Sequence, residues 1–308
     1  KCWWSDKWDP LKYGRDFDFS KPFFEQFNSL LKSVPRYSLY NVNGLNSEYC
    51  QQVMDNKDCY LCFVMKGCDS CMYMYRAVND KDCMDCSSVR DSELCYECTD
   101  SDHIYNCSFC EYCKNSSDLT LCYDLINCLH CFGCVNLRNK QYHIFNKPYS
   151  KEEFEKEYKK QIAPFGLKQF ADFKLKFPHK ALRNINNENS LGDNLTNTKN
   201  CYACFDAWEI QDCAYCTWVF TGKDYYDCYG MGDSELVYES IGDEEVHSCA
   251  FTAFVTRSND VYYSDSCFSS SYLFGCAGIK HNKYAILNKI YPKEIYDKLK
   301  FKIIEHMR

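Results

Sequence analysis

Cysteines recur along this chain at a fixed interval of twelve residues. Two such series run through the first half, and the second lies three residues after the first, so many repeats read Cys-x-x-Cys. The first series contains Cys59, Cys71, Cys83, Cys95, Cys107 and Cys131, and the second contains Cys50, Cys62, Cys86, Cys98, Cys110, Cys122 and Cys134. A short fixed period is typical of a solenoid, in which stacked repeats build one continuous core.

The whole pattern is repeated later in the chain, at an offset of 142 residues, the separation of Cys59 and Cys201. At the same offset, Asp91–Leu94 matches Asp233–Leu236, and Phe132–Cys134 matches Phe274–Cys276. The cysteines of the second half that continue the two series are Cys201, Cys204, Cys213, Cys216, Cys228, Cys249 and Cys276. A match without gaps indicates an internal duplication of a shorter repeat.

The residue types within each repeat are those of strands and turns. Cys, Tyr, Phe, Val and Met fill most positions, and polar runs such as Asn56–Asp58 and Asn79–Asp82 separate the repeats. Tyr, Phe and Val are enriched in strands, whereas Asn, Asp and Ser hydrogen-bond their own backbone in turns. The sequence therefore predicts a mostly β fold, a tandem duplicated β-solenoid with repeats of about twelve residues and short capping helices.

The segments outside the repeats are predicted to be caps and a joint. We expect an N-terminal cap with a helix over 1–43, a first solenoid block over 44–149, a capping helix and linker over 150–185, a second block over 186–290 and a C-terminal capping helix over 291–308. Ser150 and Glu153 have the spacing of a capping box, which starts a helix. Three tryptophans, Trp3, Trp4 and Trp8, are expected to cover the first turn.

Composition and charge exclude several classes of protein. A chain that is 46% hydrophobic and 17% aromatic is not disordered. No apolar run reaches the roughly 18 residues of a transmembrane helix, and the start at Lys1 is not that of a signal peptide, so we expect a cytoplasmic protein without a membrane partner. The net charge of −7 argues against nucleic acid as a partner of this segment.

The sequence leaves three uses of the cysteines open, of which the first is packing. Free cysteine behaves as a small hydrophobe, and the first series accepts Leu119 and Val237 in its place. Polar residues replace cysteine there only at Ser47 and Asn189, in the first repeat of each block. The buried ladder is predicted to contain Cys59, Cys62, Cys71, Cys131, Cys134, Cys201, Cys204, Cys213, Cys216, Cys228, Cys249 and Cys276.

The second use is a metal site. The candidate ligands are Cys83, Cys86, Cys95, Cys98, Cys107 and Cys110, which form three consecutive Cys-x-x-Cys repeats. Four thiolates from two stacked repeats could bind zinc tetrahedrally or hold an iron–sulfur cluster. The repeat produces this spacing whether or not a metal binds, which weakens the signal. Zinc is therefore a possible cofactor, with an iron–sulfur cluster as the alternative.

The third use is disulfide bonding. An oxidising compartment would allow Cys-x-x-Cys pairs to close within a repeat. The odd total of 25 cysteines stands against complete pairing.

No catalytic constellation is apparent. The seven histidines recur at no repeat position, and the chain lacks a Walker loop, a dinucleotide-binding fingerprint and a nucleophile elbow. We therefore expect a non-enzymatic scaffold or interaction module whose partner is another protein or a second copy. The candidate interface residues are the tyrosines that follow the first series, namely Tyr60, Tyr96, Tyr202, Tyr226, Tyr238 and Tyr262. The alternative is that these rings only stack along the outer wall.

Five motifs carry a resemblance to a known family. They are Trp3–Pro10, Tyr13–Ser20, Asn136–Lys140, Phe177–His179 and Ile304–Met307. With them the chain resembles, over nearly its whole length, an uncharacterised Cys-rich repeat family of uncultivated, small-genome bacteria. The resemblance implies zinc-ribbon modules before and after this region, so that the chain would be an interior segment. It also implies nucleic-acid association through those ribbons, outside the present sequence.

Overall fold

The chain forms two β-solenoid units. The computed structural model describes residues 1–308 apart from 1–2, 4, 6, 163–165, 227–228 and 239–247. The first unit contains Tyr37–His179, and the second contains Lys1–Arg36 together with Lys180–Arg308. Both units are built from stacked turns of about twelve residues, which confirms the predicted fold class.

Each turn consists of four three-residue sides with the same internal order. In the first side of one turn, Cys59 is buried, Tyr60 is exposed and Leu61 has a positive φ of 50°. The next corner residues, Val64, Gly67 and Ser70, have φ values of 59°, 69° and 56°. A left-handed residue turns the chain at nearly all of the described corners. The middle residue of each side then pairs in parallel with its equivalent on the next turn, as Tyr60 does with Met72.

Asparagine and aspartate at many of these corners form ladders between turns. The Asn43 amide donates to the Asp55 carboxylate at 2.9 Å, and the Asn127 amide donates to the Asn139 carbonyl at 3.1 Å. These residue types tolerate a left-handed backbone better than other non-glycine residues. Within the polar runs that separate the repeats, Asp58, Asn79 and Asp82 therefore lie at corners, whereas Asn56 and Asp80 are buried in the core.

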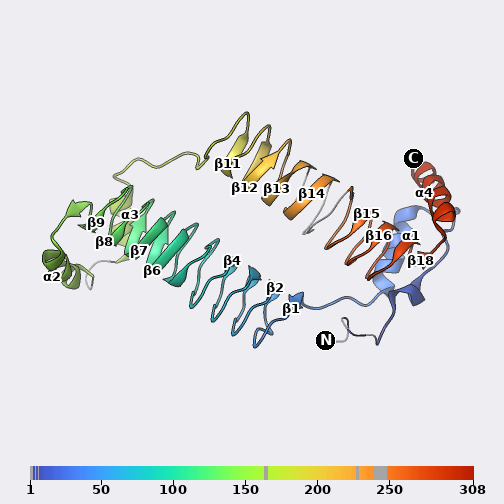
Figure 1. Cartoon of the computed structure of the whole chain (residues 1–308), viewed down its shortest axis with the longest axis horizontal. Helices are drawn as coiled ribbons and strands as arrows, with labels where there is room; N and C mark the ends of the chain where they lie inside the picture. Colours follow the sequence, from blue (N-terminus) through green and yellow to red (C-terminus); the bar gives the residue numbers. More distant parts are fainter. Residues whose placement is uncertain (1–2, 4, 6, 163–165, 227–228, 239–247) are drawn as a thin grey trace. The chain divides into compact units, whose positions relative to one another are not determined.

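The strands of the first unit are short and mostly parallel. They are β1 (Asn41–Val42), β2 (Gln51–Met54), β3 (Phe63–Lys66), β4 (Tyr75–Val78), β5 (Glu93–Tyr96), β6 (Asp102–Glu111), β7 (Lys114–Tyr123), β8 (Leu129–Phe132), β9 (Gln141–Ile144) and β10 (Lys147–Pro148). The last pair, β9 and β10, is antiparallel. Helices α2 (Lys151–Gln161) and α3 (Leu167–Lys174) follow, and their Phe154 and Phe170 pack with Phe132 and Ile144 over the end of the coil (Figure 1).

The second unit repeats this design and adds the N-terminal segment. Its elements are η2 (Pro10–Tyr13), α1 (Phe23–Ser33), β11 (Leu191–Thr196), β12 (Tyr202–Gln211), β13 (Thr217–Tyr226), β14 (Tyr229–Tyr238), β15 (Asn259–Tyr262), β16 (Ser271–Phe274), β17 (Lys283–Ile286), β18 (Lys289–Ile290) and α4 (Lys293–Met307). The β17–β18 pair is antiparallel, like β9–β10. Helices α1 and α4 both lie at this end of the second coil (Figure 1).

The N-terminal segment therefore covers the last turns of the second unit. Phe23 and Leu30 of α1 are buried with Phe274 and Ile286. The predicted place of the tryptophans over the first turn is wrong, because the Trp3 ring lies 5.7 Å from that of Phe268. Trp4 lies outside the described residues.

The first turn of each unit has a polar interior. Ser47 Oγ accepts a hydrogen bond from the Cys59 N–H at 3.1 Å, and Ser190 Oγ accepts one from the Cys201 N–H at 3.3 Å. The offset of 142 places Asn189, not Ser190, opposite Ser47, so the first turn of the second unit is one residue shorter. The slip occurs at Gly192, where φ is 153° and a Cβ atom would clash with the Cys204 carbonyl. Polar terminal repeats of this kind cover the open end of a solenoid.

Candidate functional site

The predicted ladder cysteines and the predicted metal ligands lie in the cores of the two units. Every one of them that the structure describes is buried, and its thiol is free. Cys228 lies outside the described residues. The candidate metal ligands share one core cluster with the ladder cysteines of the first unit, so the structure does not separate them into a distinct site.

The thiols hydrogen-bond to the backbone. The Cys98 thiol lies 3.5 Å from the carbonyl oxygens of Tyr96 and Cys107, to which it can donate. The Cys98 N–H in turn donates to Cys86 Sγ, twelve residues earlier, at 3.4 Å. Backbone N–H groups at buried positions thus point along the coil axis toward a side chain of the preceding turn. A buried N–H needs such an acceptor, because an unpaired polar group in the core is destabilising.

Serine makes the same contacts at other buried positions. Ser92 Oγ donates to the Arg90 carbonyl at 2.8 Å and accepts from the Ile104 N–H at 3.1 Å. Cysteine thus combines the packing of a small hydrophobe with a weak version of serine's hydrogen bonds. Sequence reasoning missed this role. The mixture of Cys, Ser, Asn and Asp within buried columns was the signal that could have shown it.

The dense cysteine patch brings several thiols together. The Cys98 thiol contacts the thiols of Cys110, Cys86 and Cys95, and these hydrogen bonds lower the pKa of Cys98. Hydrogen bonds to Cys83 and Cys98, together with burial, raise the pKa of Cys95. Burial also raises the pKa of the Cys110 thiol. Among the residues that the structure describes, no group of three or more His, Cys, Asp or Glu side chains is arranged to hold a metal ion.

A pair of substitutions at Cys98 tests the hydrogen-bonding role. We expect Cys98→Ser to lower the free energy of unfolding by about 1 kcal/mol, because the hydroxyl still accepts from the Cys110 N–H. We expect Cys98→Val to lower it by a further 1–3 kcal/mol or so, because that N–H then has no acceptor. Urea unfolding followed by circular dichroism measures both. Equal losses for the two variants would contradict the assignment and reduce the thiol to a packing group.

The predicted interface tyrosines do not all lie on an open surface. Tyr60, Tyr96 and Tyr202 are 41%, 39% and 55% exposed. Tyr262 is only partly exposed, because the Lys300 ammonium of α4 lies 4.0 Å from its ring centre. The side chains of Tyr226 and Tyr238 lie outside what the structure describes.

Some of the exposed aromatic residues form two equivalent sets, one in each unit. We call Tyr60, Phe63 and Tyr73 the first aromatic site, and Tyr202, Phe205 and Tyr215 the second aromatic site. The members of each pair are 142 residues apart. Their exposed fractions are 41%, 42% and 48% in the first site and 55%, 48% and 54% in the second.

The ring geometry of the two sites is also the same. The Tyr60 and Tyr73 rings lie 5.9 Å apart at 86°, and the Tyr202 and Tyr215 rings lie 5.6 Å apart at 87°. Edge-to-face contact of this kind is a favoured aromatic arrangement. Sequence reasoning missed the phenylalanine and the second tyrosine of each site. The 142-residue offset, applied to every exposed aromatic residue, would have found them.

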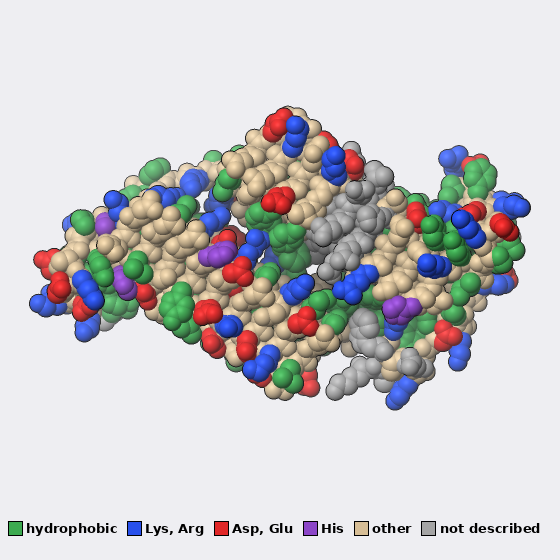
Figure 2. All heavy atoms as spheres, viewed as in Figure 1, with side chains coloured by type: hydrophobic (Ala, Val, Ile, Leu, Met, Phe, Trp, Pro, Cys, Tyr) green, Lys and Arg blue, Asp and Glu red, His purple; other side chains and the backbone are tan. Residues whose placement is uncertain are grey.

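Charges of both signs are interspersed on the face shown in Figure 2. On one side of the first unit they alternate along the coil, where Lys57 pairs with Asp69 at 3.4 Å and Lys81 pairs with Glu93 at 3.8 Å. An alternating ladder of this kind presents no broad basic surface of the type that binds phosphate backbones.

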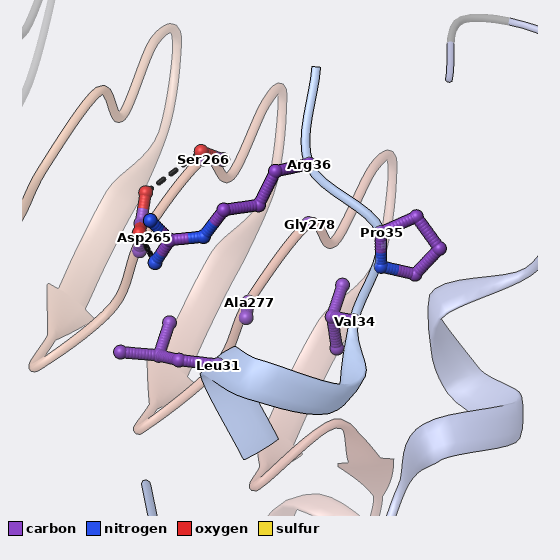
Figure 3. A pocket seen from close by; sticks show the side chains of 8 residues that line it. All are labelled: Leu31, Val34, Pro35, Arg36, Asp265, Ser266, Ala277 and Gly278. Carbon is purple, nitrogen blue, oxygen red and sulfur yellow. Dashed lines mark hydrogen bonds and ion pairs between the residues drawn. The ribbon is translucent and has the colours of Figure 1, made fainter. Parts of the chain in front are cut away.

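A small cleft lies beside the C-terminal end of α1. Leu31, Val34 and Arg36 line it on one side, and Asp265 accepts hydrogen bonds from Arg36 at 2.8 Å and from Ser266 at 2.7 Å (Figure 3). The cavity volume of the cleft is about 10 Å³. Small-molecule pockets measure roughly 300–1,000 Å³, so this cleft is a joint between cap and coil and not a ligand site.

The fold is the β-solenoid that the twelve-residue repeat predicts, and buried cysteines line its core. The chain is a cysteine-rich β-solenoid repeat protein. No family model matches it, and no curated protein matches it. Among solved structures, it is similar to a "putative acetyltransferase" from Desulfovibrio desulfuricans G20, at 9% identity over 78% of this chain and 73% of that one, with a TM-score of 0.15. None of the described helices of this solenoid has the length and apolar character needed to cross a membrane.

Proposed function

We propose that this solenoid is a non-enzymatic scaffold that binds protein partners through its two aromatic sites. The observation that carries the proposal is the duplicated pair of exposed tyrosines, with the same ring geometry in both units. Clustered exposed aromatic rings mark interaction surfaces, and tyrosine is enriched at the centres of protein interfaces.

The rival explanation is that the rings only stabilise the outer wall. Edge-to-face contact between two tyrosines contributes about 0.5–1.5 kcal/mol, which is a reason to keep the pair without any partner. Phe63 and Phe205 favour binding over this explanation. Each is more than 40% exposed on the side that follows its tyrosine, and no aromatic ring contact among the described residues includes either.

A peptide-library experiment tests the proposal. Random peptides displayed on phage are selected on the wild-type protein and then measured against a variant with Tyr60→Ser, Tyr73→Ser, Tyr202→Ser and Tyr215→Ser. We expect the selected peptides to bind the variant at least about tenfold more weakly, because aromatic anchors dominate binding energy. Tyr105→Ser is the matched control, since Tyr105 is 47% exposed but belongs to neither site. Selected peptides that bind wild type and variant equally would refute the proposal.

A structural metal site is the second candidate function. The observation behind it is the density of buried cysteines in three consecutive turns, from Cys83 to Cys110. Among the described residues they form no group of three or more thiols arranged around a metal ion. Metal analysis by mass spectrometry, on protein purified without a metal column, tests it directly. Zinc that is present in wild type and lost in Cys98→Ser would support the site, whereas metal-free wild type would refute it.

Membership of the Cys-rich family that the five motifs resemble is likewise a proposal, and zinc-ribbon modules in the full-length gene would support it.

A further inference from the structure

We propose that the partner of the aromatic sites is a basic, arginine-rich polypeptide segment and that each chain offers two equivalent sites for it. The inference rests on the proposed function and adds the chemistry of the partner and the number of sites. It follows from the charged residues that border the aromatic sites in both units.

Acidic side chains border the first aromatic site. On the next three turns the position of Tyr60 is occupied by Met72, Met84 and Tyr96, which are 40%, 40% and 39% exposed. Together with Tyr60 they form one exposed apolar column. Asp58 and Asp82 are the corner residues two positions before Tyr60 and Met84. Asp85 follows Tyr73 by twelve residues and so occupies the equivalent corner on the next turn.

Lys57 and Lys81 are the basic residues next to this border, and both are paired with carboxylates. The Lys81 ammonium lies 3.8 Å from the Glu93 carboxylate. The Lys57 ammonium lies 3.5 Å from the Asp58 carboxylate and 3.4 Å from that of Asp69. None of the salt bridges among the described residues includes Asp82 or Asp85. The column formed by Tyr60, Met72, Met84 and Tyr96 therefore has two carboxylates at its edge, Asp82 and Asp85, that no described salt bridge neutralises.

The second aromatic site has the same kind of border. Asp212 and Asp224 are corner residues with positive φ, and at the 142-residue offset they match Ser70 and Asp82. Hydrogen bonds from the side chains of Asn200 and Gln211, together with the nearby charges of Lys223 and Lys199, lower the pKa of Asp212 and keep it negatively charged. The Lys199 ammonium lies 3.1 Å from the Glu188 carboxylate, and Lys223 is a basic side chain at this border. Acidic residues thus lie along the same column of corners in both units. Asp224 matches Asp82 and is acidic in both units, whereas Asp212 matches Ser70.

Aromatic rings beside carboxylates favour arginine over other side chains. A guanidinium can stack flat on a tyrosine or phenylalanine face while its N–H groups bind a carboxylate, and it is weakly hydrated. Lysine offers a charge but no plane, and an acidic or purely apolar segment would meet the aspartates unfavourably. The chain's net charge of −7 attracts the same class of partner over a longer range.

Titration calorimetry with octa-arginine as the probe tests the inference. We expect two sites per wild-type chain, one site in Tyr60→Ser/Tyr73→Ser, one in Tyr202→Ser/Tyr215→Ser, and none when all four are replaced. Tyr105→Ser is expected to keep both sites. The conservative pair Tyr60→Phe/Tyr73→Phe should also keep both, since the ring faces remain. Octa-lysine is expected to bind about tenfold more weakly. Circular dichroism confirms that each variant is folded.

Each contrary result has a separate meaning. Octa-arginine could bind the four-tyrosine variant as strongly as wild type, bind no more tightly than octa-lysine and lose its affinity in high salt. That result would show non-specific electrostatic attraction and would overturn the inference. Phage-selected peptides that need the tyrosines but contain no excess of arginine overturn the basic partner and leave the proposed function standing. A dimer in sedimentation velocity that is lost in the four-tyrosine variant replaces the basic partner by a second copy. If no peptide of any kind needs the tyrosines, both proposals fall.

Discussion

Replacing Asp80 with asparagine is expected to stabilise the first unit increasingly as the pH rises from 3.8 to about 8, and to remove a large pH dependence from its unfolding. Asp80 is fully buried in a core column, where its Oδ1 accepts from the Ser92 N–H at 2.8 Å. Its Oδ2 has no hydrogen-bond partner among the described atoms. Burial raises the pKa of Asp80 from 3.8 to about 8. Negative charges at Asp91 and Asp102 act in the same direction.

The sign of the pH effect follows from that shift. A carboxyl whose pKa is higher in the folded state binds its proton more tightly there, so it favours folding most below pH 3.8. This contribution is lost as the pH rises through about 8. The full effect is on the order of 5 kcal/mol. The asparagine introduced by Asp80→Asn would keep the acceptor for the Ser92 N–H and remain neutral, as the natural Asn56 does in accepting from the Cys68 N–H at 3.0 Å.

Urea unfolding across this pH range measures the difference between wild type and Asp80→Asn. The two proteins should be similar in stability at low pH and diverge steadily toward pH 8, with the variant more stable. Asp85→Asn, at an exposed corner, is the matched control and should follow wild type. A constant difference at all pH values would show that Asp80 does not titrate on unfolding.

Phe23→Ala is expected to destabilise the second unit by about 3–5 kcal/mol and to leave the first unit unchanged. Phe23 is 2% exposed, and its ring lies 5.1 Å from that of Phe274 and 5.3 Å from that of Tyr263. Its removal leaves a cavity between α1 and the last turns, where the surrounding residues belong to a packed cluster. The neighbouring Phe24 is 59% exposed, so Phe24→Ala should change stability by less than about 1 kcal/mol.

Hydrogen exchange locates the effect of Phe23→Ala. Amides of residues 249–286 should lose protection in the variant, whereas those of residues 50–134 should keep it. The reverse pattern would mean that the N-terminal helix caps the first block, which directly follows it in the sequence.

Several elements of the fold were accessible to sequence reasoning, and each rests on a local pattern. The twelve-residue period is visible because buried positions must be small or apolar, and cysteine at Cys59, Cys71 and Cys83 meets both demands. The helix after Ser150 was accessible because its capping box is local, and the structure forms both of its hydrogen bonds. Tyr60, Tyr96 and Tyr202 were accessible as surface candidates because they follow buried positions in a regular coil.

The four-sided turn was not accessible in the same way. Corners with positive φ fall on residues such as Leu61, Val64 and Tyr73, which are locally disfavoured there. Hydrogen bonds between neighbouring turns, such as that from the Tyr73 N–H to the Tyr60 carbonyl at 3.0 Å, offset this preference. The conformational preferences of single residues therefore do not reveal where the corners lie. They also do not reveal the hydrogen bonds between thiols and backbone, which depend on the position of the corners.

The order of residues along the chain was enough to establish the repeat, the duplication and the β-solenoid class, since all three depend on which positions are buried at a fixed spacing. Long-range packing decided the rest. The apolar side of α1 carries no local sign of the coil that it covers, and its contacts, such as that of Phe23 with Phe274, assign it to the second unit. Tyr262 differs from Tyr60 because α4 returns over it. Burial by a segment distant in the sequence leaves no local trace, which is why these positions needed the folded structure.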